Sequence, residues 1–365
     1  MTGVGVMDLY SGEPQTRFKD NMPIYVIAIC QYYNLDGAEV TTIESDWDFS
    51  VKFSAGTEVY LMPWSLQSLD LSGVQEGVVL PLEKVEEKPW EIIEFGEYPQ
   101  SLKADNVSIV SQTPDADGYY LGDDGERYAK HTINLDSNEL FWGEVPLYTL
   151  DGVLMENGET YYFKVEPIKW RVLKTENGES LIVADEILKG MQYLADESSH
   201  NGAPEGTHPN NYVYSDLRAF LTGEFYDVAF SDDEKTKIQT TLVDNSAETL
   251  LYEDFACDNT EDKVFALSYA DTINEEYFFS TNSTGHVPDR FWRPSDYAVA
   301  TGTFVNSGET IIGATFPYLI GSGDVWLRSP WGSDSQVSFV SGSSSDDGLY
   351  AEYYGGVAPA MRITR

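Results

Sequence analysis

The side chains that could carry covalent or metal chemistry are few and scattered along the chain. The only cysteines are Cys30 and Cys257, and neither stands in a CxxC or Cys/His pattern. This spacing excludes a disulfide scaffold and a standard zinc site. The histidines are equally dispersed: His131, His200, His208 and His286. His200 and His208 lie eight residues apart in a Gly/Pro/Asn-rich segment, which favours a solvated loop over a metal site.

Hydrolytic and calcium chemistry leave equally weak signals. No G-x-S-x-G elbow occurs, and carboxylates are so abundant that no catalytic pair can be singled out. The segment SQTPDADGYYLGDDGERY (111–128) spaces its aspartates as if for calcium, but Tyr119 stands where an EF-hand loop needs a third ligand. Asp-Gly steps between Tyr-rich arms are typical of hairpin turns. We therefore expect no enzymatic activity and no cofactor, with calcium left open only as a structural ion.

The charge balance narrows the classes of partner. The chain carries 61 Asp and Glu against 22 Lys and Arg, a formal net charge of −39. Such a surface repels phosphate backbones and anionic lipids, so nucleic acid and membrane partners are not expected. No run of 18 apolar residues and no secretory signal occurs, which predicts a chain without membrane insertion. As written it is expected in the cytoplasm, or at the cell surface or secreted if a signal was removed, and the compartment stays open.

Two domains are predicted. Residues 1–88 read as a small β-rich domain, and the acidic, proline-ended stretch 83–89 as a linker to a second domain at 89–365. Within the second domain, alternation in 161–188 places Ile168, Trp170 and Val172 on one buried strand face. Ser215 is expected to cap a helix over 215–230. A second short helix should follow, because Ser231 and Glu234 have capping-box spacing.

The helix over 215–230 has an apolar stripe that predicts its buried face. That stripe consists of Leu217, Phe220, Leu221 and Phe225.

The C-terminal segment from Trp326 is rich in Ser, Asp, Gly and Tyr, a composition that suits recognition surfaces and also ordinary turns. Trp326 is expected in the core, and Trp331 at the surface. In YAEYYGG (350–356), alternation sends Tyr350, Glu352 and Tyr354 to one face and Tyr353 to the other. The candidate ligand-binding residues are Trp331, Ser333, Ser335, Ser343, Ser344, Ser345, Asp346, Asp347, Leu349, Tyr350, Tyr353 and Tyr354.

Several segments, taken in order, resemble an uncharacterised bacterial domain family related to the formylglycine-generating-enzyme branch of the C-type lectin fold. The matching segments are EFGEYPQS (94–101), YYFKVEPIKWRVL (161–173), SDLRAFLTGEFYDVAFSDDEK (215–235), KVFALS (263–268), RPSDYAVA (293–300) and WLRSPWGSDSQVSFVSG…GGVAPAMRI (326–363). The resemblance implies an α+β domain with a twisted antiparallel sheet, two main helices and long loops. In this fold the chain ends meet in the sheet.

The resemblance also bears on activity. The enzymatic branch uses a pair of active-site cysteines, whereas Cys257 is the only cysteine in 90–365. The family usually ends in Gly-Val-Arg-Pro-Ala, and here Ala358 stands in place of the arginine. Arg362 and Arg328 are the two candidates to supply the missing positive charge. The same fold hosts variable proteins of diversity-generating retroelements, whose adenine-directed variation produces mainly residues such as Ser, Asp, Gly and Tyr.

These observations predict a non-enzymatic ligand-binding protein with a variable C-terminal surface. A more specific hypothesis is that a retroelement diversifies this surface. A protein ligand is the expected partner. The alternatives are a structural or adhesive module of a bacterial surface protein, and carbohydrate binding.

Overall fold

The computed structural model describes residues 90–136, 140, 147–149, 152–196, 202–281, 290–305, 321–342 and 346–365. It also describes the backbone of two short antiparallel strands, β1 (Glu39–Thr42) and β2 (Phe49–Lys52). The rest of the predicted domain 1–88 lies outside these residues, so its boundary stays a prediction. Trp90–Thr149, Val153–Asn306 and Gly321–Arg365 belong to one compact unit.

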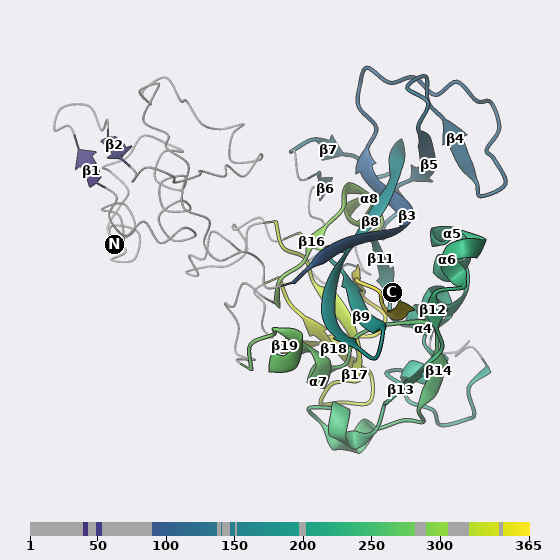
Figure 1. The fold of residues 1–365 in the computed structure, drawn as a ribbon, viewed down its shortest axis with the longest axis vertical. Coiled ribbons are helices and arrows are strands. Elements are labelled where there is room, and N and C mark those ends of the chain that lie inside the picture. Colours follow the sequence, from purple (N-terminus) through teal and green to yellow (C-terminus); the bar gives the residue numbers. More distant parts are fainter. Residues whose placement is uncertain are drawn as a thin grey trace. The chain divides into compact units, whose positions relative to one another are not determined.

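The larger sheet of this unit has eight strands in the order β12-β21-β9-β8-β5-β4, with β3 paired to β8 and β15 paired to β21, all antiparallel (Figure 1). The strands are β3 (Ile92–Leu102), β4 (Tyr119–Leu121), β5 (Arg127–Thr132), β8 (Thr160–Glu176), β9 (Glu179–Ala184), β12 (Ile238–Gln239), β15 (Val264–Phe265) and β21 (Ala360–Thr364). Figure 1 shows β8 and β9 running through the middle of the unit.

Strand β8 is the central strand of this sheet and pairs with β3, β5 and β9. Ile168, Trp170 and Val172 are buried, as the alternation predicted, and the Trp170 indole donates to the Phe95 carbonyl at 2.7 Å. The hairpin to β9 turns at Asn177 and Gly178, both with positive φ (53° and 83°), the pairing that a two-residue type I′ turn requires.

The smaller sheet has five strands in the order β11-β20-β17-β18-β19. They are β11 (Lys189–Gln192), β17 (Val325–Pro330), β18 (Gln336–Val340), β19 (Asp346–Tyr350) and β20 (Tyr354–Val357). Every residue of β17 is buried, and Trp326 is 1% exposed, which confirms its predicted place in the core.

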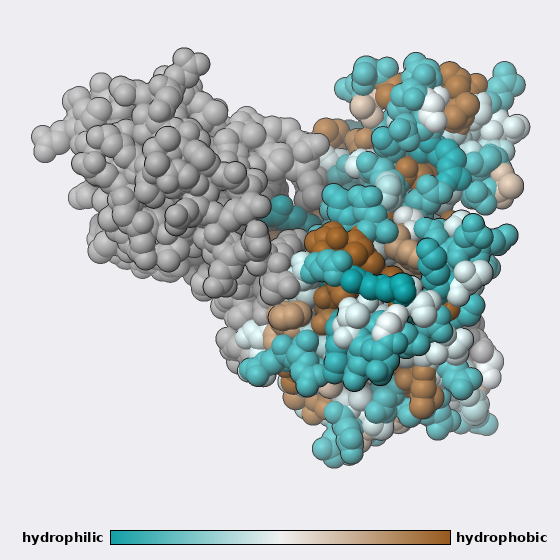
Figure 2. Space-filling model, in the orientation of Figure 1, coloured by the Kyte–Doolittle hydropathy of each residue, from teal (hydrophilic) through white to brown (hydrophobic). Residues whose placement is uncertain are grey.

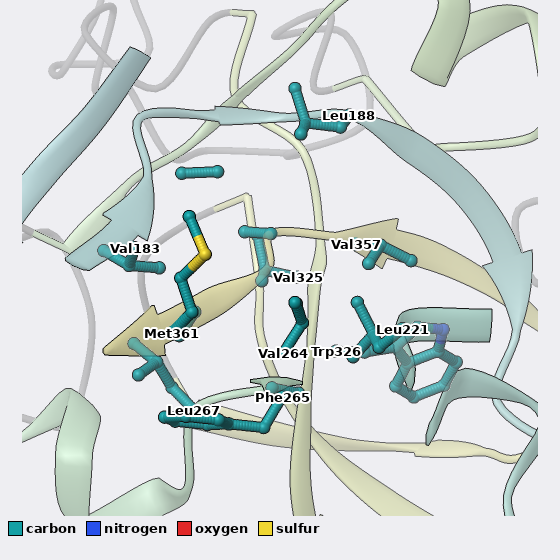
Figure 3. Packing of buried hydrophobic residues seen from close by; sticks show 14 of the residues in the cluster. Val183, Leu188, Leu221, Val264, Phe265, Leu267, Val325, Trp326, Val357 and Met361 are labelled. Atoms are coloured by element: carbon teal, nitrogen blue, oxygen red, sulfur yellow. The ribbon is translucent and has the colours of Figure 1, made fainter. Parts of the chain in front are cut away.

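The two sheets share one hydrophobic core. In Figure 3, Met361 of β21 lies between Val183 of β9 and Val325 of the smaller sheet, and Val357 of that sheet belongs to the same cluster. All four are at most 3% exposed. Buried apolar area stabilises by about 25 cal/mol per Å², so this shared core holds the two sheets together.

The predicted helical segment 215–230 is confirmed. It consists of α4 (Asp216–Phe220), a π-helical turn η4 (Leu221–Phe225) and α5 (Tyr226–Ala229), and Ser215 Oγ accepts from Arg218 N. Its predicted stripe is buried: Leu217, Phe220, Leu221 and Phe225. Ser231 and Glu234 form the expected capping box at the start of α6 (Asp232–Lys235).

Helix α6 is tied to strand β3 by Glu234, whose carboxylate accepts from Gly96 N at 2.9 Å. Gly96 has φ +68°, and a Cβ there would overlap the Phe230 ring. Only glycine fits this position because both the backbone conformation and the space exclude a side chain.

The remaining elements are short. The helices are η3 (Tyr212–Tyr214), η5 (Ala247–Thr249), η6 (Glu253–Phe255), α7 (Tyr269–Thr272), η7 (Glu275–Tyr277) and α8 (Asp296–Ala300). The strand pairs are β6 (Leu147–Tyr148) with β7 (Leu154–Met155), β10 (Glu186–Ile187) with β16 (Arg293–Pro294), and β13 (Thr241–Val243) with β14 (Thr260–Asp262). The unit is thus mixed α/β, mostly strand with a few short helices.

The aspartates of 111–128 take part in turns. Asp115 Oδ1 accepts from Asp117 N at 3.0 Å and from Tyr119 N at 2.8 Å, and Asp124 Oδ1 accepts from Glu126 N at 3.1 Å. These are the local side-chain to backbone bonds that aspartate makes in tight turns. The turn interpretation of this segment is confirmed.

Candidate ligand-binding surface

The C-terminal candidates are carried by the smaller sheet and its turns. Trp331 follows β17, and its backbone N donates to the Gln336 carbonyl at 2.9 Å to close the turn into β18. From a distant loop, the buried Asn210 amide donates to the carbonyls of Ser333 (2.7 Å) and Gln336 (3.1 Å). The backbone of this turn is therefore held from both sides, which lowers the conformational entropy that the turn loses on binding.

Trp331 is half-buried over the outer strand of the sheet. A Cβ added at Gly348 of β19 would overlap its indole, so the ring lies directly against the backbone there. Its other neighbour is Tyr252, with ring centroids 5.1 Å apart at 72°. Edge-to-face pairs of this kind stabilise by about 0.5–1.5 kcal/mol beyond area burial.

Tyr350 and Tyr353 form a second aromatic pair, with centroids 6.2 Å apart. The prediction that they face opposite sides was wrong because the segment is not one strand. Strand β19 ends at Tyr350, the chain turns, and Tyr353 N donates to the Tyr350 carbonyl at 3.0 Å. The turn brings both rings to the same place, with Tyr350 46% exposed and Tyr353 packed partly against the core.

The strand pattern places the two pairs on one face of β19. Alternation along β19 points the side-chain directions of Gly348 and Tyr350 to the same face. Trp331, which covers Gly348, is therefore a neighbour of Tyr350 on that face. We call Tyr252, Trp331, Tyr350 and Tyr353 the aromatic surface.

Two polar candidates border it, Ser333 and Ser335. Ser333 Oγ donates to Gln336 Oε1 at 3.0 Å and Ser335 Oγ to Asp334 Oδ1 at 3.2 Å. Both serines are half-buried. Exposed Asp334 and Glu352 give the border an acidic character, whereas exposed Asp347 points to the opposite face of β19 from Gly348 and Tyr350.

Two other candidates point inward. Leu349 is 1% exposed and belongs to the main core. The Asp346 carboxylate is buried against Arg290, which is itself fully buried, and the two form an ion pair. Burial raises the pKa of Asp346, and the Arg290 charge opposes that shift. Neither side chain can reach a ligand, so the binding surface omits both. Ser343, Ser344 and Ser345 lie outside the described residues.

Tyr354 belongs to a different feature, a pocket of about 280 Å³ where the two sheets meet. Its lining includes His131 at the end of β5, Lys189 and Gln192 of the edge strand β11, and Asp216 at the start of α4. Tyr354 pairs with Gln192 across β11 and β20. Its ring is packed against Gly302, where a Cβ would overlap it.

The sequence missed Tyr252, Asn210 and the whole pocket. Gly348 did carry a usable signal, because a glycine inside a strand pattern often marks the close approach of another group. Tyr252 and Asn210 carry none, since their partners lie in segments about 80 and 120 residues further along the chain.

Two side chains with catalytic potential, Cys257 and His208, lie in structural surroundings. Burial raises the pKa of the Cys257 thiol, so it is not a thiolate nucleophile near neutral pH. Within the part of the chain that the structure describes, no three His, Cys, Asp or Glu side chains gather as a metal site. His208 instead packs edge-on against Phe255 at 5.7 Å.

Hydrophilic residues cover most of the described part of the face shown in Figure 2, with small hydrophobic groups between them. No helix among the described residues is both long and apolar enough to cross a bilayer.

One comparison with known proteins gives a match. A family described as a domain of unknown function, DUF6273, matches residues 177–365. The range begins in the β8–β9 turn and contains every strand of the smaller sheet. No curated protein and no solved structure matches the chain.

Proposed function

We propose that this chain, which belongs to the DUF6273 family, is a non-enzymatic binding protein that contacts another protein through its aromatic surface. The observation that carries the proposal is the pairing of Trp331 with Tyr252 and of Tyr350 with Tyr353 on a fixed β scaffold. Tyr and Trp supply large contact area at low conformational cost and dominate binding energy at protein interfaces.

The charge around this surface supports a basic partner. Asp334 and Glu352, which lie next to these rings in the chain, are exposed, on a chain of net charge −39. Complementary charge at the border of an interface speeds association and makes it dependent on salt. The partner is therefore expected to present basic residues around an apolar centre.

We further propose that the fold is a C-type-lectin-like one of the formylglycine-generating-enzyme branch, and that the segment around the aromatic surface is varied by a retroelement. The antiparallel sheet and the ion pair of Arg365 with Glu91 at 2.9 Å support the fold, because that fold brings the ends of the domain together. A reverse transcriptase gene nearby, with a near-copy of the 326–360 coding segment differing at adenines, would support the variation. Its absence would contradict it.

Capture experiments test the binding role. Immobilised wild-type chain, Tyr350→Ala and Tyr148→Ala are compared by mass spectrometry of the proteins each retains from a lysate of the source cell. Tyr148, in β6, is a matched control because it is a tyrosine of similar exposure (44% against 46%).

Some proteins should be retained equally by wild type and by Tyr148→Ala. The amount of these proteins that Tyr350→Ala retains should be at least about tenfold lower, since hot-spot truncations cost about 2 kcal/mol or more. Retention should also fall in high salt. Equal retention by all three chains would refute the proposal. Equal thermal midpoints would show that folding is not the cause of any loss.

A further inference from the structure

The pocket beside Tyr354 has its charged groups already engaged. Lys189 Nζ lies 3.4 Å from the Glu224 carboxylate and 4.3 Å from the centre of the Phe220 ring. Asp216 Oδ2 accepts from Ala195 N at 2.8 Å. An ionised ligand would have to compete with these contacts, so the pocket is not built around a ligand charge.

The groups of this pocket that remain available for hydrogen bonds to a ligand are uncharged. Gln192 Nε2 donates to the Glu352 carbonyl at 2.6 Å, which fixes the amide and turns its oxygen into an oriented acceptor. Asn134, exposed at the pocket, adds an amide with both a donor and an acceptor. Among the described residues, neither the Gln192 oxygen nor the Asn134 amide has another hydrogen-bond partner.

His131 contributes in its neutral form. Burial lowers its pKa, although a hydrogen bond to the Ala300 carbonyl opposes the shift. A neutral imidazole that donates through one nitrogen has an acceptor on the other. The ring is held edge-on to Tyr297 at 5.7 Å, so the position of that acceptor is fixed.

An aromatic ring beside neutral donors and acceptors suits a ligand with apolar C–H faces and several hydroxyl groups. The volume of about 280 Å³ lies just below the range of sites for drug-sized molecules, roughly 300 Å³ and above. We propose that this pocket binds an uncharged sugar ring of monosaccharide size, between His131, Gln192 and Tyr354. This site is separate from the aromatic surface and does not depend on it.

Saturation-transfer NMR tests the site with glucose, galactose, mannose and N-acetylglucosamine, and with glucosamine and glucuronate as charged counterparts. At least one neutral sugar should bind wild-type chain with a dissociation constant on the order of millimolar, as expected for about a dozen non-hydrogen atoms. Glucosamine and glucuronate should bind several-fold more weakly than glucose, the neutral sugar of the same configuration.

Ala195→Trp blocks the pocket from an exposed position, and Ala116→Trp, at an exposed alanine of the 111–118 turn, is its matched control. The saturation-transfer signal should vanish with Ala195→Trp and persist with Ala116→Trp and Tyr350→Ala. Gln192→Met removes one oriented hydrogen bond, so it should weaken the affinity for the sugar at least about fivefold. Binding by Ala195→Trp at the wild-type level, or no signal from any neutral sugar, would overturn the proposal. The outcome of the protein-capture experiment with Tyr350→Ala does not change what is expected for sugar binding. The two proposals can therefore fail independently.

Discussion

Replacing Gly348 by alanine should push the Trp331 indole out of its position, while residue 331 itself stays a tryptophan. The added Cβ would overlap the indole, which is held between β19 and the Tyr252 ring. Forcing one extra carbon into such a contact costs about 1–3 kcal/mol. Loss of the Trp331–Tyr252 pair accounts for about 0.5–1.5 kcal/mol of this.

A double-mutant cycle isolates the clash. Urea unfolding gives the free energy of unfolding for wild type, Gly348→Ala, Trp331→Ala and the double variant. In the Trp331→Ala background the space is open, and alanine fits a strand better than glycine does, by roughly 0.5–1 kcal/mol. Gly348→Ala should then be neutral or stabilising, which gives a coupling energy of about 1–4 kcal/mol.

Gly332→Ala is the matched control, because its Cβ would lie 3.4 Å from the same Tyr252 ring, an ordinary van der Waals distance. It should change the free energy of unfolding by less than about 0.5 kcal/mol. If Gly348→Ala is equally destabilising with and without the indole, Trp331 does not lie where the structure puts it, and the aromatic surface is not formed as described.

Three further predictions concern the supports of this surface and of the sheet. Asn210→Ala should lower the free energy of unfolding by about 1–3 kcal/mol in urea titrations, since it leaves two carbonyls of the turn without their buried donor. Leu349→Ala should cost about 2–5 kcal/mol and the adjacent Tyr350→Ala less than about 1 kcal/mol in the same assay, because only the first side chain is in the core. Burial alone would raise the pKa of Glu234, but hydrogen bonds from Ser231 and Gly96 lower it overall, below its ordinary value of 4.5. This stabilisation is present above that pH and lost as the pH falls through the folded-state pKa, so the stability advantage of wild type over Glu234→Gln should shrink in thermal melts below about pH 4.5.

The sequence predicted features that depend on neighbours within a few residues. The cap at Ser215 and the capping box at Ser231 follow from hydrogen bonds that span three positions. The buried face with Trp170 follows from alternation along one strand. Each of these patterns is complete within its own segment, so no tertiary information was needed.

The candidate surface depends on contacts that no local pattern contains. Leu349 and Asp346 look like their exposed neighbours in the sequence. Only the core beneath β19 and Arg290, 56 residues earlier, show that their side chains are buried. The turn after Tyr350 is fixed partly by a bond from Ala351 N to the Ser335 carbonyl, across two strands. Alternation alone could not reveal where the strand ends.

Strand β21 pairs with three partners, β9, β12 and β15, all of which precede it in the sequence. During synthesis the edge of β9 therefore emerges long before its partner exists. At about 5–20 residues per second, a ribosome would leave that edge open for roughly 10–40 seconds. A nascent chain with an open, apolar strand edge is prone to aggregate, so a chaperone that shields this segment should raise the yield of folded protein.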